Sequence, residues 1–452
     1  MAEASTNLAY FSGLLQSVAE RGRAWARTRR AEPLGVPALL DLCQKLLKGR
    51  GEASEAATAR LILDGYGALN PADKRAFLVG ATDRFTADVD ALTTAARAFL
   101  DNADAANATT LFERAEPPRQ ELIRRLNHAP GGTLSLVKMR EDLLSVMRDE
   151  PRAELFDRDF RHMFASWFNR GFLVLRRIDW TSPANILEKI IQYEAVHAIA
   201  DWNDLRRRLD PPDRRLYGFF HPAIGDEPLI FVEVALTPAI PDAIQPVLAP
   251  DRAPISPAQA TTAVFYSISN AQKGLAGVSF GNFLIKQVVE DLKREWPKLT
   301  NFVTLSPVPG FVAWLKRERA DEASPLMNAE TQRALALTDR AGWTDKAGAR
   351  EAVAKVLPTL AAHYFLRAKS ASGKPLDPVA RFHLGNGARL ERLNPFGDLS
   401  ASGVKQSLGL MVNYLYDLDR IEQNHEAFAN RNEVAASATV KKLAPAPVAK
   451  GP

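Results

Sequence analysis

The chain has 452 residues, more than one ordinary hydrophobic core can organise, and it therefore predicts two domains. Hydrophobic residues make up 46% and charged residues 25%, as in ordinary globular proteins, and no stretch approaches the ~18 apolar residues of a membrane span. The net charge is +5, but the basic residues are interleaved with acidic ones along the chain, which argues against nucleic acid as a partner. The single cysteine, Cys43, excludes an intramolecular disulfide and a multi-cysteine zinc site.

Residues 1–172 are rich in Ala, Leu, Arg and Glu, and their apolar residues recur at helical spacing. Proline and glycine breakers divide this pattern into helices of ordinary length, which predicts a helical bundle. The bundle has more apolar stripes than one small core needs, so we expect it to be the oligomerisation domain. The arginines between residues 21 and 30 leave open the possibility of an organellar transit peptide. Residues 8–15, however, fit an ordinary amphipathic helix, so we favour the cytoplasm as the location.

Beyond residue 172 the sequence mixes β-rich runs with helical segments, so residues 173–432 predict a second domain of mixed α/β structure. We expect strands or extended pieces at 172–180, 216–222, 229–236, 263–269, 301–305, 379–384 and 389–393, helices at 186–198, 280–296 and 327–366, and a closing segment at 403–432. The tail, residues 433–452, is rich in Ala, Lys and Pro and predicts disorder.

A glycine-containing turn, Gln272-Lys273-Gly274-Leu275-Ala276-Gly277, connects the β-rich run at 263–269 to the amphipathic helix at 280–296. Backbone N–H groups of such a turn, together with the positive end of the helix dipole, can hold a pyrophosphate. A tight turn that binds no ligand would show the same sequence pattern. The string Gly-Val-Ser-Phe-Gly at 277–281 matches a serine-nucleophile elbow, but about ten residues of loop separate its serine from the strand, so we reject that reading.

The turn resembles the acetyl-CoA loop of GNAT-type acyltransferases, although its Q-x-G-L-A-G spacing departs from their usual Q-x-x-G-x-G. A wider set of motifs resembles malonyl-CoA decarboxylase over residues 176–416. These motifs are VFYSIS-x-x-Q-x-GL-x-GV, FLIK-x-VV, LSP-x-PGF, FHL-x-NGA and GLM-x-NY-x-Y, in that order. The resemblance implies an α+β protein, with an all-helical N-terminal bundle followed by a GNAT-like mixed α/β catalytic domain.

The resemblance also implies a reaction, in which malonyl-CoA is converted to acetyl-CoA and carbon dioxide by a carbon–carbon lyase. Coenzyme A enters as part of the substrate, and no further cofactor or metal is expected because the thioester itself accepts the electrons. The catalytic residues implied are Ser306 in LSPVPGF and His383 in FHLGNGA. The substrate-binding residues expected are Ser267, Gln272, Gly274, Ala276, Gly277, Val278, Ser279, Phe280, Gly281, Asn282, Asn386 and Tyr414.

Each of these residues has a structural reading beside the functional one. Ser306 before Pro307 would also cap a helix, and a histidine between two apolar residues is often a hydrogen-bonded core residue. Asn386-Gly387 is first a turn signal, and Tyr414 is first an aromatic core residue. Ser306 would orient the malonyl carboxylate, and His383, with an ordinary histidine pKa of about 6.5, would protonate the nascent carbanion.

Two other functions stay open from the sequence. A GNAT-like acyltransferase would use the same coenzyme A loop, but would need an amine acceptor. A non-catalytic acyl-CoA-binding assembly protein would use the N-terminal bundle as its working surface. The family forms tetramers, so we expect self-association into a homo-oligomer, with malonyl-CoA as the ligand and neither nucleic acid nor membrane as a partner.

Overall fold

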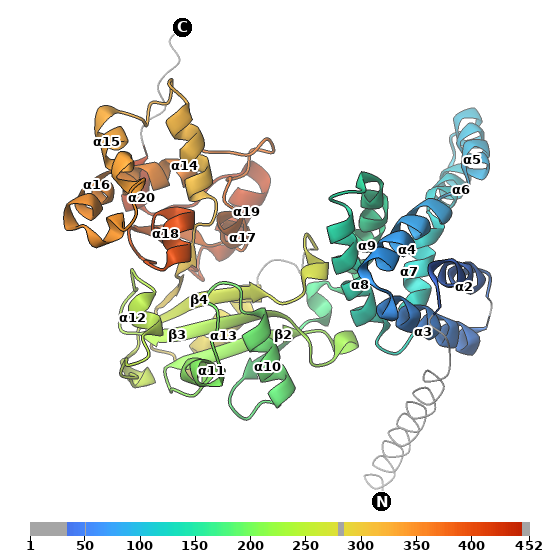
Figure 1. The fold of residues 1–452 in the computed structure, drawn as a ribbon, viewed down its shortest axis with the longest axis horizontal. Coiled ribbons are helices and arrows are strands. Elements are labelled where there is room, and N and C mark those ends of the chain that lie inside the picture. The colour runs from blue at the N-terminus through green and yellow to red at the C-terminus, as the bar shows by residue number, and fades with distance from the viewer. Residues whose placement is uncertain (1–33, 50, 279–283, 445–452) are drawn as a thin grey trace, which may run out of the picture. The chain divides into compact units, whose positions relative to one another are not determined.

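The computed structural model describes residues 34–49, 51–278 and 284–444 (Figure 1). The chain forms two compact units, Met1–Phe164 and Ala165–Pro452, of which the first is helical and the second combines helices with a mixed sheet. This confirms the predicted α+β class. The boundary falls before the predicted one at residue 172, because the last helix of the first unit continues into the second. No helix in the described part of the chain is long and apolar enough to cross a membrane.

The first unit is a bundle, and three of its helices begin at the proline and glycine breakers Pro71, Pro118 and Gly132. Its helices are α2 (Val36–Lys48), α3 (Glu52–Ala68), α4 (Pro71–Arg84), α5 (Val89–Asp101), α6 (Ala105–Ala115), α7 (Pro118–Leu126), α8 (Gly132–Val146) and α9 (Glu154–Trp167). The Asn70 side chain caps α4 by accepting a hydrogen bond from Asp73 N–H, and Pro71 follows at the first helical position. Within the bundle, Arg140 forms a buried ion pair with Asp157 at 2.8 Å.

The second unit is built on one sheet with the strand order β1-β2-β3-β4-β5-β8-β6, in which β7 pairs with β8. Its strands are β1 (Val174–Ile178), β2 (Arg214–Phe220), β3 (Pro228–Thr237), β4 (Thr262–Asn270), β5 (Asn301–Thr304), β6 (Ser306–Pro307), β7 (Arg389–Asn394) and β8 (Met411–Leu415). Among these pairs only β4 and β5 run parallel; α13 (Leu284–Glu295) lies between them in the chain. This strand–loop–helix–strand unit is the GNAT-like arrangement that the glycine turn predicted.

Helices cover both faces of the β1–β4 part of the sheet, which explains why β3 is buried along nearly its whole length. Leu216 on β2 packs with α10 (Ala184–Tyr193) and α11 (Trp202–Leu209) in one core cluster. The next residue, Tyr217, points to the opposite face, where its hydroxyl donates to Asp291 of α13 at 3.0 Å. The strand predicted at 229–236 is therefore covered by helices on both faces.

The helices after β6 gather at one end of the sheet, as Figure 1 shows in orange and red. They are α14 (Phe311–Ala320), α15 (Ala329–Thr338), α16 (Ala347–Leu366), α17 (Pro378–Gly385), α18 (Ala401–Ser407), α19 (Ile421–Arg431) and α20 (Ala438–Leu443). Two predictions were wrong here. Residues 379–384 form helix α17, not an extended piece, because the Asp377 carboxylate caps a helix that starts with Pro378. Part of the tail predicted to be disordered forms α20, which buries Val440.

Candidate active site

Ser306 lies just beyond β5, where pairing with β4 has ended and pairing with β8 continues. Thr304, at the end of β5, is opposite Phe265 of β4, whereas Ser306 pairs with Val412 of β8. The Ser306 side chain is buried, 5% exposed, on the same face of the strand as Thr304 two residues earlier. The prolines on either side of Val308 follow directly, so this short strand ends at once.

His383 is presented by the last turn of α17. The helix ends at Asn386, and Gly387 follows with φ of +82°, a left-handed conformation that favours glycine. A Cβ at Gly387 would lie 2.1 Å from the carbonyl oxygen of Ile421, so this position also excludes any side chain. The tight turn at Gly387 fixes where α17 ends. It thereby fixes the position of His383 relative to Ser306.

A chain of hydrogen bonds joins four buried side chains at this point. The Ser306 hydroxyl donates to Thr304 Oγ1 at 2.8 Å, and its oxygen lies 3.1 Å from His383 Nε2. His383 Nδ1 lies 2.8 Å from the Tyr416 hydroxyl. With Ser306 donating to Thr304, the consistent arrangement has the Tyr416 hydroxyl donating to Nδ1 and the ring proton on Nε2, directed at Ser306.

The electrostatics of the histidine depart from the prediction. Burial lowers the pKa of His383 to about 3, because no carboxylate offsets the loss of water around the ring. The ring is therefore neutral at neutral pH, not a group that titrates near 6.5. Tyr414 stacks on the imidazole with ring centroids 4.6 Å apart, which further fixes its plane.

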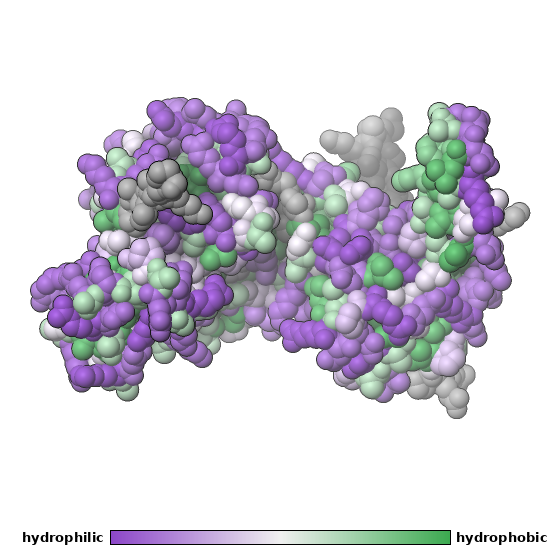
Figure 2. Space-filling model, turned by 90° about the horizontal axis from the view of Figure 1, so that it is seen from above, coloured by the Kyte–Doolittle hydropathy of each residue, from purple (hydrophilic) through white to green (hydrophobic). Residues whose placement is uncertain are grey.

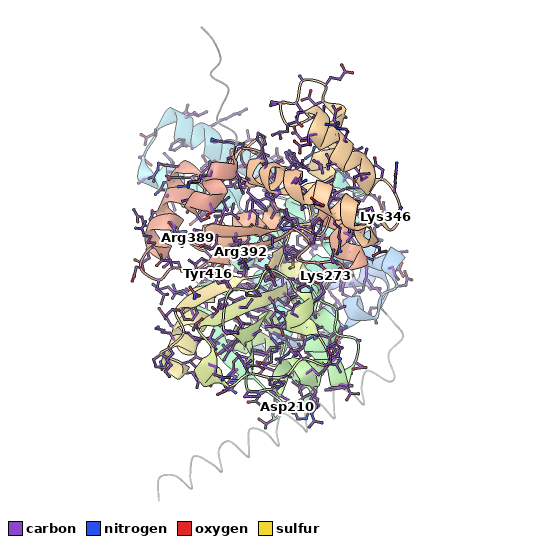
Figure 3. All side chains as sticks on the ribbon, turned by 90° about the vertical axis from the view of Figure 1, so that its left-hand side faces the viewer. Asp210, Lys273, Lys346, Arg389, Arg392 and Tyr416 are labelled. Atoms are coloured by element: carbon purple, nitrogen blue, oxygen red, sulfur yellow. The ribbon has the colours of Figure 1, made fainter. Side chains whose placement is uncertain are left out.

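Ser306 and His383 open onto a cavity of about 270 Å³. Apolar side chains dominate its lining, including Phe265, Ile268 and Phe382. A charged group that enters this cavity exchanges part of its water for apolar side chains, which strengthens electrostatic interactions there relative to solvent. In Figure 3, Tyr416 and Lys273 lie at the level where the green and yellow sheet meets the orange and red helices.

The opposite wall of the cavity is the free edge of β4. Pairing between β4 and β5 ends at Phe265, but β4 continues to Asn270. On the β3 side the register shifts between Glu233 and Val234, so Tyr266 is the additional residue of a bulge. The two parallel strands therefore separate beyond Phe265, and the peptide groups of the β4 edge lie beside the cavity.

Four of the predicted binding residues do not line this cavity but contact residues around it. The Ser267 hydroxyl donates to the buried Glu194 carboxylate at 2.7 Å. The Gln272 side chain donates to the Pro228 carbonyl at 3.1 Å and so anchors the start of the glycine loop. Asn386 donates to the carbonyl of Phe382 at the end of α17, and Tyr414 stacks on His383.

The glycine loop itself contains a short 3-10 turn, Lys273–Leu275, after which Gly277 adopts φ of +74°. Gly274 is buried, whereas Ala276 and Gly277 are exposed. Gly277 and Val278 line a second cavity rather than the one around Ser306. The remaining predicted loop residues, Ser279, Phe280, Gly281 and Asn282, lie outside the described residues.

Sequence reasoning missed Thr304 and Tyr416, which hold the two ends of the hydrogen-bond chain. Tyr416 follows Tyr414 by two residues in GLMVNYLY, so a strand there would have placed both on one face. No group of three or more His, Cys, Asp or Glu side chains suited to a metal ion is found among residues 34–49, 51–278 and 284–444.

Comparisons with known proteins agree with this architecture. Residues 171–450 match the family described as malonyl-CoA decarboxylase C-terminal domain, and residues 85–168 match its N-terminal domain. The mitochondrial malonyl-CoA decarboxylase of Anser anser anser is 37% identical over 72% of this chain and 69% of its own length. The mitochondrial enzyme of Mus musculus is 33% identical over 84% of this chain and 83% of its own length.

Two solved structures are also similar. The malonyl-CoA decarboxylase from Rhodopseudomonas palustris superimposes with a TM-score of 0.88 at 58% identity, covering 91% of this chain and 100% of the other. The one from Agrobacterium vitis gives 0.85 at 54% identity, covering 90% and 99%. The fold, the ordered motifs and both family matches lead to one conclusion: this chain belongs to the malonyl-CoA decarboxylase family.

Proposed function

We propose that this chain converts malonyl-CoA to acetyl-CoA and carbon dioxide, with Ser306 and His383 acting on the malonyl group. The observation that carries the proposal is the 3.1 Å contact between Ser306 Oγ and His383 Nε2 at the wall of an apolar cavity. Two residues that are 77 positions apart meet there, Ser306 from the strand beside β8 and His383 from the end of helix α17. A merely structural pair would not need to open onto a cavity.

In the proposed reaction the bond between the malonyl carboxylate and C2 breaks, and its electrons move into the thioester carbonyl to give an enolate. Ser306 orients the carboxylate, so that this bond stands out of the plane of the thioester. The apolar lining weakens the solvation of the carboxylate, which favours its departure as neutral carbon dioxide. The enolate then takes a proton at C2, so that each turnover consumes one proton from solvent.

His383 supplies that proton from Nε2, the nitrogen directed at Ser306. A neutral imidazole is a weak acid, so the loss of this proton must be balanced at the other nitrogen. The Tyr416 hydroxyl, 2.8 Å from Nδ1, can transfer its proton as Nε2 gives up its own, and the proton consumed from solvent then restores the hydroxyl. Entry of the negatively charged malonyl group also favours a protonated ring, because a nearby opposite charge raises the pKa of a histidine.

The developing charge on the thioester oxygen needs a hydrogen-bond donor. We propose that a backbone N–H of β4 beyond Phe265 provides it, since among the described residues β5 no longer pairs with this part of the strand. The predicted loop residues, from Gln272 to Asn282 in the chain, would hold the rest of coenzyme A. Gly277 supports this role, since a left-handed residue directs successive N–H groups outward. The thioester is the electron sink, so no separate cofactor is proposed.

We further propose that the first unit mediates self-association into a homotetramer. The hairpin of α5 and α6 exposes large apolar side chains that a lone unit would leave in water. Val89 is 71%, Leu100 80% and Phe112 76% exposed. Figure 2 shows green surface along this hairpin. A second copy of the same hairpin is the simplest cover, and the native mass of the protein tests it. The cytoplasm, or an organellar matrix, remains the predicted location.

The test of the reaction is to incubate the purified protein with malonyl-CoA, without metal or amine acceptor, and to follow acetyl-CoA and carbon dioxide by mass spectrometry. We expect both products in equal amounts. Turnover only after addition of an amine would favour the acyltransferase, and binding without turnover would favour the assembly protein.

A further inference from the structure

A second cavity adjoins the catalytic one. It has a volume of about 570 Å³ and is lined by the end of the glycine loop and by residues of α17 and α19. Phe382 lines both cavities, so the two adjoin at this side chain. Two residues of α17 line different cavities: His383 lines the first and Arg381 lines the second.

The polar part of this lining is cationic. Lys374 and Arg381 contribute to it, and none of the described residues that line the cavity is an Asp or Glu. Among the described residues, neither Lys374 nor Arg381 forms an ion pair with a carboxylate, although most other arginines of this unit do. Two positive groups that share a cavity without a counter-ion repel one another, and an anionic ligand removes that cost.

The Arg381 side chain is held in place by hydrogen bonds to the backbone, as a residue that binds an anion would need to be. Its Nη1 donates to the carbonyls of Pro375 and Leu376 at 2.9 and 2.8 Å, which fixes the plane of the guanidinium. Asp377 interacts electrostatically with Arg381 but does not line this cavity, and its carboxylate accepts from Ala380 N–H at 2.8 Å and from the Tyr364 hydroxyl at 3.3 Å.

We propose that Lys374 and Arg381 bind a phosphate group of the coenzyme A tail, across the second cavity from Gly277. Apart from its two chain neighbours, no atom of the described residues lies within 4 Å of where a Cβ of Gly277 would be, which is consistent with close approach of a ligand. The malonyl thioester would then reach Ser306 past Phe382, with the phosphates remaining in the cationic cavity. This inference rests on the proposed function for the identity of the ligand, but the anion site can be measured without turnover.

Lys374 is exposed, so Lys374→Glu should fold, and it replaces attraction to a phosphate with repulsion. A hydrogen bond between charged partners of this kind corresponds to roughly ten- to a hundredfold in affinity. We expect KM for malonyl-CoA to rise by that factor, with kcat unchanged. Malonyl-pantetheine, which has the same thioester but no phosphate on its tail, should be turned over equally by the variant and the unaltered protein.

The matched control is Lys346→Glu. Lys346 is an exposed lysine at the start of α16 that lines neither cavity, and it is labelled in Figure 3. The control should leave KM unchanged, and Arg381→Gln should raise it as Lys374→Glu does. An unchanged KM for malonyl-CoA in Lys374→Glu, or an equal loss with both substrates, would overturn the proposal.

Calorimetry with adenosine 3′,5′-bisphosphate, a coenzyme A fragment without a thioester, separates this inference from the reaction. Binding that Lys374→Glu abolishes supports the phosphate site even if malonyl-CoA is not decarboxylated. Binding that is equal in both proteins refutes the site even if decarboxylation is rapid.

Discussion

Replacing Tyr416 with Phe should slow the reaction although this side chain does not line the catalytic cavity. The substitution removes only the hydroxyl that lies 2.8 Å from His383 Nδ1. Both residues are buried, so no water replaces the lost donor, and an unsatisfied buried acceptor costs about 1–3 kcal/mol. The Nε2–H tautomer loses that stabilisation, so we expect kcat to fall by roughly 10- to 100-fold, as for other hydrogen-bond partners of functional histidines.

The assay is steady-state release of acetyl-CoA by Tyr416→Phe, with Tyr414→Phe as the matched control. The Tyr414 ring stacks on the same imidazole, but its hydroxyl forms no hydrogen bond with His383. Because Tyr416 positions a group rather than contacting substrate, KM should stay within about twofold while kcat falls. An unchanged kcat in Tyr416→Phe, or equal losses in the two variants, would refute the assigned tautomer and the proton balance.

Two further predictions concern stability. Gly387→Ala should lower the free energy of unfolding by about 3 kcal/mol, since its Cβ would lie 2.1 Å from Ile421 O at φ of +82°. Gly277→Ala, left-handed but with open space, should cost only about 1 kcal/mol; equal losses in urea unfolding would contradict the steric argument. Burial lowers the pKa of His383 from 6.5 to about 3, so the unfolded chain binds a proton that the folded chain excludes. Stability should therefore fall as pH decreases from 6.5 towards 3, and less so in His383→Gln; identical pH slopes would falsify the neutral buried ring.

The sequence predicted the parts of the site that are local in the chain. The glycine loop between a strand and a helix could be recognised because its signals lie within about thirty residues. The strands at 263–269 and 301–305 were predicted close to their observed bounds, and their apolar content was sufficient for that. Ser306 and His383 were identified through motif order, not through any property of the two residues themselves.

The rest depends on contacts between distant segments. Helix α17 is only eight residues long, and Val379 and Phe382 favour β-structure, so the segment was predicted to be extended. The helix start signal, Asp377 followed by Pro378, was overlooked. Strand β8 lies inside the predicted closing segment, and its pairing with β5, β6 and β7 brings Tyr416 to His383. The depressed pKa of His383 likewise arises from burial by residues far away in the chain, which no local pattern encodes.

The most direct test of the account is to compare His383→Asn and Ser306→Ala with the unaltered protein, measuring carbon dioxide release and malonyl-CoA binding on the same samples. Loss of the proton donor should reduce kcat by roughly 10²- to 10⁴-fold in His383→Asn. We predict that both variants bind malonyl-CoA and release little carbon dioxide. Release at the original rate from either variant would contradict the assignment of Ser306 and His383 as the residues that act on the malonyl group.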